Sequence, residues 1–160
     1  MELTSLKWTN RFLRIAREVS TWSKDPSTRV GVVAVSAEGK ILSTGYNGFP
    51  SKLDDKECRL VDRETKYAYT VHGEMNCIYN AASNGVSLKN STMFVYGLPV
   101  CSECCKGVIQ SGVSRVVCMY DRKKIEVDDN KWGRSLILSK AMFDEAGVVV
   151  EILDISEILE

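Results

Sequence analysis

The only histidine of the chain, His72, opens the tripeptide His72-Gly73-Glu74, and a Cys-x-x-Cys motif, Cys101 to Cys104, follows 29 residues later. Imidazole and thiolate are preferred ligands of Zn²⁺, and three protein ligands leave a fourth position for water, as in catalytic zinc sites. A shared metal requires a fold that brings two distant segments together. We therefore predict His72, Cys101 and Cys104 as the ligands of one catalytic zinc ion.

Glu74 is the predicted catalytic residue. In the middle of a helix, residues i and i+2 point about 200° apart, so Glu74 can face a metal bound by His72 only from an irregular first turn. Gly73 between them suits such a turn. From there the carboxylate can move a proton between a water molecule and a substrate ring, which is general acid/base catalysis.

Each motif alone has other readings. A single histidine is usually a packed or surface residue, and an isolated Cys-x-x-Cys motif can be redox-active or structural. A structural zinc site needs a fourth ligand, for which the chain offers Cys58, Cys77, Cys105 and Cys118. Cys77 and Cys105 are expected to point elsewhere on their helices, so the combined motifs favour a catalytic zinc.

Hydrophobic periodicity predicts helices alternating with strands. Residues 47–70, between the second strand and the second helix, are expected to be irregular. The order predicts one domain, residues 1–160, folded as a three-layer α/β/α sandwich with a mixed five-stranded sheet. The helices are expected at 8–22, 72–83, 101–110 and 134–146, and the strands at 30–35, 41–46, 92–96, 113–119 and 148–152.

Composition narrows the class of protein. The 160 residues fit one domain, and no signal peptide or membrane-spanning run is readable, so we expect a cytoplasmic protein (the host cytosol for a viral chain). Lysines plus arginines equal aspartates plus glutamates, 21 each. Because phosphate contacts drive nucleic-acid affinity, this balance makes a long nucleic acid an unexpected substrate.

Beyond the zinc motif, the chain resembles the deoxycytidylate (dCMP) deaminases of the cytidine deaminase superfamily from about residue 8 to residue 150. The zinc motif carries the resemblance to the superfamily. The stretch Gly45-Tyr46-Asn47-Gly48-Phe49-Pro50 and the long loop behind it point to the dCMP branch. Further matching segments are 23–31, 65–67, 71–76 and 108–112.

The resemblance implies hydrolytic deamination of dCMP to dUMP and ammonia, which supplies dUMP for thymidylate synthesis. It implies His72, Cys101 and Cys104 as zinc ligands, Glu74 as proton shuttle, and Asn47 as a contact to the nucleotide sugar–phosphate. The family commonly forms homohexamers, so a homo-oligomer is expected.

Two further residues are candidate substrate contacts. Arg29 is the first candidate for the 5′-phosphate, because guanidinium groups match phosphate oxygens. A solvated charge beside a strand is the alternative reading of Arg29. Gly73 stands where the family usually has alanine, and it is expected to affect the backbone contacts to the base.

The loop over residues 48–55 aligns with the region where dCMP deaminases bind allosteric dCTP or dTTP with Mg²⁺. The resemblance therefore makes Gly48, Pro50, Asp54 and Asp55 candidate allosteric residues. Asp54 and Asp55 are equally compatible with isolated acids on the surface.

A second departure from the family is Val100, which separates Pro99 from Cys101 in the loop that approaches the base. Alternative substrates are therefore a 5-substituted dCMP, guanine or a nucleic-acid base. A further alternative is an inactive, zinc-containing nucleotide-binding module. The intact Glu74 argues against that module, since a structural site has no need of it.

Overall fold

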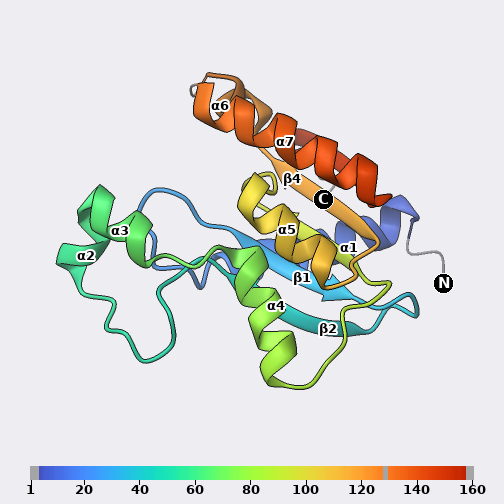
Figure 1. Cartoon of the computed structure of the whole chain (residues 1–160), viewed down its shortest axis with the longest axis horizontal. Helices are drawn as coiled ribbons and strands as arrows, with labels where there is room; N and C mark the ends of the chain where they lie inside the picture. Colours follow the sequence, from blue (N-terminus) through green and yellow to red (C-terminus); the bar gives the residue numbers. More distant parts are fainter. Residues whose placement is uncertain (1–3, 128–129, 158–160) are drawn as a thin grey trace.

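The computed structural model describes residues 4–127 and 130–157 (Figure 1). Its centre is a five-stranded sheet in the order β2-β1-β3-β4-β5. The central strand β3 pairs antiparallel with β1 and parallel with β4, so the predicted mixed sheet is confirmed. The strands are β1 (Gly31–Val35), β2 (Ile41–Tyr46), β3 (Thr92–Tyr96), β4 (Arg115–Tyr120) and β5 (Val149–Asp154).

Helices cover both faces of the sheet, which confirms the three-layer α/β/α fold. Side chains alternate between the faces of a strand, so Val33 of β1 joins the core cluster under α1 (Leu6–Ser20), whereas its neighbour Val32 joins the other cluster. That second cluster lies under α4 (Gly73–Ser83), α5 (Ser102–Gln110) and α7 (Asn130–Ala146). None of the described helices is long and apolar enough to cross a membrane.

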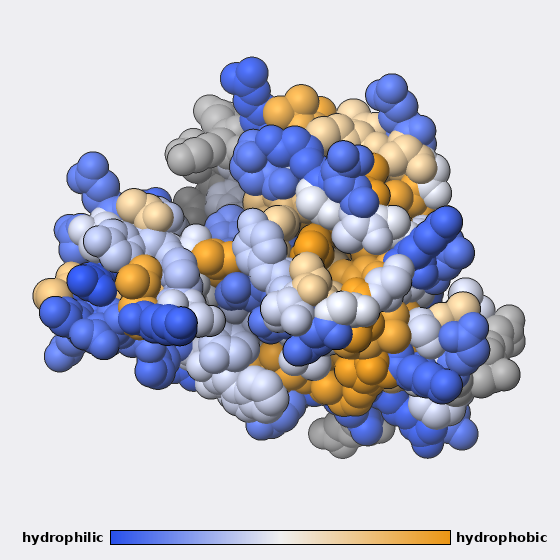
Figure 2. All heavy atoms as spheres, turned by 60° about the horizontal axis from the view of Figure 1, so that its bottom comes forward, coloured by the Kyte–Doolittle hydropathy of each residue, from blue (hydrophilic) through white to orange (hydrophobic). Residues whose placement is uncertain are grey.

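Residues 47–70 contain two short helices, α2 (Glu57–Val61) and α3 (Arg63–Tyr69), where the sequence predicts an irregular segment. They form an arm beside the sheet (Figure 1), which in Figure 2 is mainly hydrophilic with isolated hydrophobic side chains. A buried ion pair links the arm to the body, because Lys66 Nζ donates to Asp25 Oδ1 at 3.1 Å. Short polar helices held by such tertiary contacts have no hydrophobic periodicity to reveal them.

The sequence also did not indicate one short helix, α6 (Arg122–Val127), and a final 3₁₀ turn, Ile155–Glu157. The other differences from the expected elements are shifts at their ends. The helix expected at residues 134–146 begins earlier, at Asn130. Helices α4 and α5 each begin one residue after the predicted start, so His72 and Cys101 occupy N-cap positions. This shift places both residues in extended backbone just outside a helix.

Helix α4 lies against β2 at Gly45, where the two backbones approach closely. A Cβ atom on Gly45 would stand 2.3 Å from the backbone nitrogen of Cys77 and 2.4 Å from the carbonyl oxygen of Gly73. Only a residue without a side chain allows this approach. The first glycine of the stretch Gly45 to Pro50 therefore sets how deeply the helix that begins after His72 sits on the sheet.

Gly45→Ala is expected to destabilise the fold by about 3 kcal/mol, the upper range for overpacking a close contact, because both opposing atoms belong to backbone. Gly133→Ala is the matched control, since a Cβ there meets nothing within 4 Å. Alanine in that exposed helical position should be neutral or stabilise by up to about 1 kcal/mol. Urea unfolding of both variants measures the difference, and equal midpoints would contradict the close approach.

Candidate zinc-centred active site

His72 is held by the backbone that leads into α4. Its φ and ψ of −67° and 154° are extended, and its carbonyl oxygen accepts the first helical hydrogen bond, from the backbone N–H of Asn76, at 2.9 Å. Glu74 is the second residue of the helix. The sequence predicts an irregular first turn that includes His72, whereas the structure places His72 in extended backbone before the helix and Glu74 in its first turn. From these positions both side chains can face one site.

The two cysteines occupy the start of α5 in the same way. Cys101 is the N-cap residue, and its Sγ accepts the backbone N–H of Cys104 at 3.4 Å. A helix N-terminus carries partial positive charge from its unpaired N–H groups, which stabilises anionic sulfur. The local structure therefore favours thiolate at the position where a metal ligand is needed.

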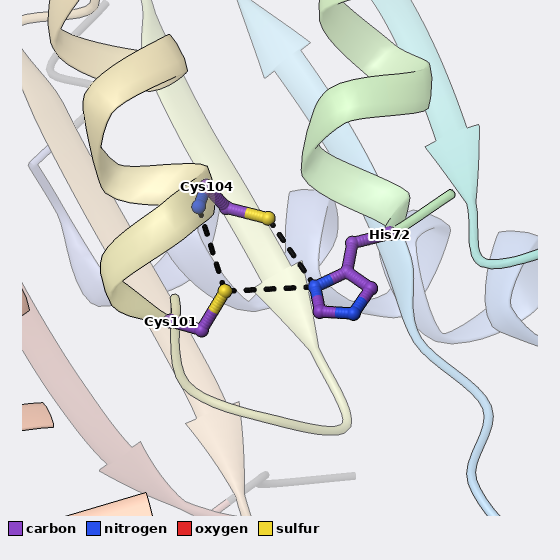
Figure 3. A group of neighbouring side chains, drawn as sticks. All are labelled: His72, Cys101 and Cys104. Carbon is purple, nitrogen blue, oxygen red and sulfur yellow. Dashed lines mark hydrogen bonds between the residues drawn. The ribbon is translucent and has the colours of Figure 1, made fainter. Parts of the chain in front are cut away.

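The two helix starts bring the three predicted ligands together (Figure 3). His72 Nδ1 lies 3.5 Å from Cys101 Sγ and 3.3 Å from Cys104 Sγ, and the ligand atoms of the three residues all lie within 4.8 Å of one another. One imidazole and two thiolates form the donor set that zinc prefers in a tetrahedral site. The geometry and chemistry of this cluster fit a zinc ion.

The remaining cysteines do not join the cluster. Within the described residues, His72, Cys101 and Cys104 are the one group of three or more potential ligands that converge. Cys105 Sγ donates instead to the backbone carbonyl of Ser139 at 3.5 Å, while Cys77 and Cys118 are buried and Cys58 is exposed. In the part of the chain that the structure describes, no further cysteine is placed to serve as a fourth ligand. A zinc ion held by these three residues would keep one coordination position for water.

The pKa values of the two cysteine thiols shift in opposite directions. A hydrogen bond from the Cys104 thiol lowers the pKa of Cys101 to about 4, despite burial. The same hydrogen bond, together with burial, raises the pKa of Cys104. The lowered pKa of Cys101 favours its thiolate, which is the form of cysteine that binds a metal.

Glu74 is buried beside the sulfurs, with 4% of its surface exposed. Burial, which disfavours the charged carboxylate, raises the pKa of Glu74 to about 7. Its carboxyl group also lies within hydrogen-bonding reach of the Cys104 thiol. A carboxyl group with a pKa near neutrality can both accept and return a proton, which suits general acid/base catalysis.

Gly73 allows α4 to approach β1. A Cβ atom at this position would lie 3.2 Å from Val32 Cγ2, 3.3 Å from Val30 Cγ1 and 3.4 Å from the Val30 carbonyl oxygen. Alanine, the residue expected from the family pattern, would require these neighbours to move by a few tenths of an ångström. Gly73 thus affects how closely the first turn of α4, which carries Glu74 and follows His72, packs against Val30 and Val32.

Val100 is buried in the core cluster beneath α4 and α5, with 3% of its surface exposed. The core therefore accommodates the side chain of Val100, the extra residue between Pro99 and Cys101.

Asn47 is buried, and its side chain binds backbone. Its Oδ1 accepts the N–H of Val30 at 2.8 Å, and its Nδ2 donates to the carbonyl of Thr28 at 2.9 Å. Arg29, which lies between these two partners, is exposed, with Nε donating to the Asp25 carbonyl at 3.3 Å. Asn47 therefore orients the segment that presents Arg29, and the contacts of both residues to substrate stay predictions.

Two of the four candidate allosteric residues line a pocket and two do not. Gly48 and Asp55 line it, whereas Pro50 and Asp54 lie elsewhere in the loop, where their backbone carbonyls accept hydrogen bonds from Leu53 and Arg59. The other lining residues are Trp22, Lys24, Asp25, Tyr46, Asn47, Phe49, Leu60 and Thr70.

Lys24 and Lys66 belong to the segments 23–31 and 65–67 that match the family pattern, but no sequence pattern assigns an individual role to them or to Trp22. Trp22 packs edge-on against Tyr46, and Lys24 Nζ lies 2.6 Å from Asp55 Oδ2 at the pocket. Lys66 is 6% exposed and donates to Asp25 and to Ser27 Oγ. Because the residues of these pairs lie 24 to 41 residues apart along the chain, no local pattern reveals the contacts.

Comparisons with known proteins agree with this geometry. Residues 6–120 match the model of the cytidine and deoxycytidylate deaminase zinc-binding region. An uncharacterised deaminase from the luxG 3′ region of Aliivibrio fischeri is 38% identical over 144 residues, covering 90% of this chain and 92% of that protein. The deoxycytidylate deaminase of Pongo abelii is 36% identical over 148 residues, covering 89% and 78%.

Among solved structures, the dCMP deaminase of cyanophage S-TIM5 in complex with dCMP and dUMP superposes with a TM-score of 0.71 at 22% identity, covering 94% of this chain and 99% of that one. At this identity the similarity establishes the fold. With the family match over residues 6–120 and the converging His-Cys-Cys cluster, the chain belongs to the cytidine and deoxycytidylate deaminase family of zinc-dependent enzymes.

Proposed function

We propose that the protein hydrolyses dCMP to dUMP and ammonia, the reaction that provides dUMP for thymidylate synthesis. The convergence of His72 Nδ1 with the sulfurs of Cys101 and Cys104 beside the buried Glu74 carries the proposal. The choice of dCMP is supported by relatives named deoxycytidylate deaminase and probable deoxycytidylate deaminase, which are matched over 78% and 70% of their own lengths.

In this proposal His72, Cys101 and Cys104 hold the zinc ion. When bound, zinc lowers the pKa of a coordinated water molecule to about 7 and so supplies the nucleophile that replaces the amino group of the base. Glu74 would accept a proton from the water and deliver it to the ring nitrogen. It would then move the second proton, from the new hydroxyl group on the ring, to the amino group, which leaves as ammonia. Because Glu74 is buried, the proton stays within the site between these transfers.

Arg29 and Asn47 complete the proposed substrate site. Arg29 offers an exposed guanidinium to the 5′-phosphate, and Asn47 fixes the backbone of residues 28–30 on both sides of Arg29. Gly73 places the first turn of α4 beside the base. Arg29 lies against Gly97, directly after the carboxyl end of β3, and ligands of α/β sheets bind beyond that end of the strands.

We also propose that dCTP or dTTP with Mg²⁺ regulates the enzyme at the pocket beside Gly48. The pocket offers aromatic surface from Trp22 and Phe49, with Lys24 and Asp55 paired at 2.6 Å. A triphosphate would attract Lys24, and its Mg²⁺ would attract Asp55. An effector would therefore compete with this exposed ion pair, which contributes little stability of its own.

The proposal includes a homo-oligomer in the cytoplasm. The six cysteines are free within the described structure, and thiols that bind zinc must stay reduced, as they do in the cytosol. Size-exclusion chromatography with light scattering tests the oligomer.

Purified protein with zinc is expected to convert dCMP to dUMP and ammonia. Ammonia release from dCMP should be faster than from deoxycytidine, dCTP, 5-methyl-dCMP or guanine. Arg29→Ala should lower kcat/KM for dCMP by about 10- to 100-fold, the worth of a charged hydrogen bond. It should leave the slower reaction with deoxycytidine unchanged, because that substrate has no phosphate.

Ammonia from none of these cytosine nucleotides would refute the proposed reaction. Preference for 5-methyl-dCMP or guanine would instead support one of the alternative substrates. An equal loss on dCMP and deoxycytidine would reject Arg29 as the phosphate contact.

Addition of dCTP or dTTP with Mg²⁺ is expected to shift the dCMP concentration at half-maximal rate. Asp55→Asn should abolish this response, because it removes the proposed ligand of the effector's Mg²⁺. Asp54→Asn changes the neighbouring acid, which does not line the pocket, and should keep the response. Identical saturation curves with and without both nucleotides would reject the regulatory site.

A further inference from the structure

Helix α7 lies outside the segment that matches the zinc-binding family model, which ends at residue 120. It nevertheless runs along α5, the helix that begins at the two cysteines, on the same face of the sheet (Figure 1). This arrangement connects the zinc motif to a part of the chain that the family model does not describe.

Ser135 of α7 binds the first turn of α5 at two points. Its Oγ accepts the backbone N–H of Ser102 at 2.9 Å and donates to Ser102 Oγ at 3.1 Å. Ser102 is the first residue of α5, between Cys101 and Cys104. One hydroxyl group therefore fixes both the backbone and the side chain of the residue that follows the first zinc ligand.

This contact satisfies a donor that the helix itself leaves unpaired. The first N–H groups of a helix have no partner within it, and at α5 the N–H of Cys104 bonds to Cys101 Sγ while that of Ser102 bonds to Ser135. One turn further along both helices, Cys105 Sγ donates to the Ser139 carbonyl. Two successive turns of α7 thus contact two successive turns of α5, at Ser102 and at Cys105.

We propose that Ser135 is a positioning residue for the zinc site, which holds the first turn of α5 so that the sulfurs of Cys101 and Cys104 keep the spacing a metal requires. It touches neither metal nor substrate. The inference rests on the zinc ligands of the proposed function, but it does not depend on which base is deaminated.

Ser135→Ala is expected to release zinc to a chromogenic chelator about tenfold faster than the wild type, the low end of the effect of partners outside the ligand set. In the cobalt-substituted protein, the sulfur-to-cobalt absorption bands should shift, since the Cys101–Cys104 geometry relaxes. Ser135→Thr keeps the hydroxyl and should restore both readouts. Ser111→Ala removes a hydroxyl at the far end of α5 and serves as the matched control.

Zinc release and cobalt spectra equal to wild type in Ser135→Ala would overturn the inference, and so would equal changes in Ser111→Ala. If Ser135→Ala does not fold, Ser102→Ala decides, because it removes one of the two contacts: about threefold faster release supports the role, and wild-type release rejects it. Neither readout needs turnover. If the wild type deaminates no substrate but Ser135→Ala still changes zinc release and the cobalt spectrum, only the deaminase proposal is refuted.

Discussion

The meeting of two helix N-termini over one end of the sheet is the arrangement on which the rest of the structure depends. Strand β3 ends at Tyr96 and leads into α5, so Cys101 lies at the carboxyl end of β3. Strand β1 runs antiparallel to β3 with Gly31 opposite Tyr96, and Gly73 packs against Val30 at the start of β1. The sheet register therefore brings His72 and Cys101 to the same place.

The same packing connects the pocket beside Gly48 with the zinc site. Gly48 and Val71 exchange two backbone hydrogen bonds, of 3.1 and 2.8 Å, and Val71 directly precedes His72. Asn76, in the first turns of α4, also donates to the carbonyl of Tyr46, which lines the pocket. In the proposed regulation, a nucleotide that displaced Gly48 would act on the zinc ligand His72 through the hydrogen bonds between Gly48 and Val71.

The sequence predicted what depends on local pattern. Apolar periodicity located the sheet and the large helices, and the converging ligands follow from residue types whose chemistry is specific to zinc. The sequence predicts that His72 and Glu74 face one metal only from an irregular first turn, and the structure meets this need with His72 at the cap position. The arm at residues 57–69 escaped prediction because Lys66 and Asp25, which anchor it, are 41 residues apart.

The supporting residues of the site were hidden for the same reason. Ser135 is an ordinary polar residue in the sequence, and only the packing of α7 on α5 brings it to Ser102. Asn47, a predicted substrate contact, bonds through its side chain to the backbone of residues 28 and 30, and no local pattern reveals these partners. Gly45 belongs to the stretch that resembles the dCMP branch, and in the structure it allows the close packing of α4.

The most direct test of the account is the zinc content and dCMP turnover of Glu74→Gln, measured on one sample. One zinc per chain with kcat lowered at least about 100-fold, the contribution of general acid/base catalysis, is the predicted result. Glu103→Gln, an exposed acid on α5, should keep both zinc and turnover. Wild-type turnover in Glu74→Gln, or loss of its zinc, would contradict a site in which three residues hold the metal and Glu74 moves the proton.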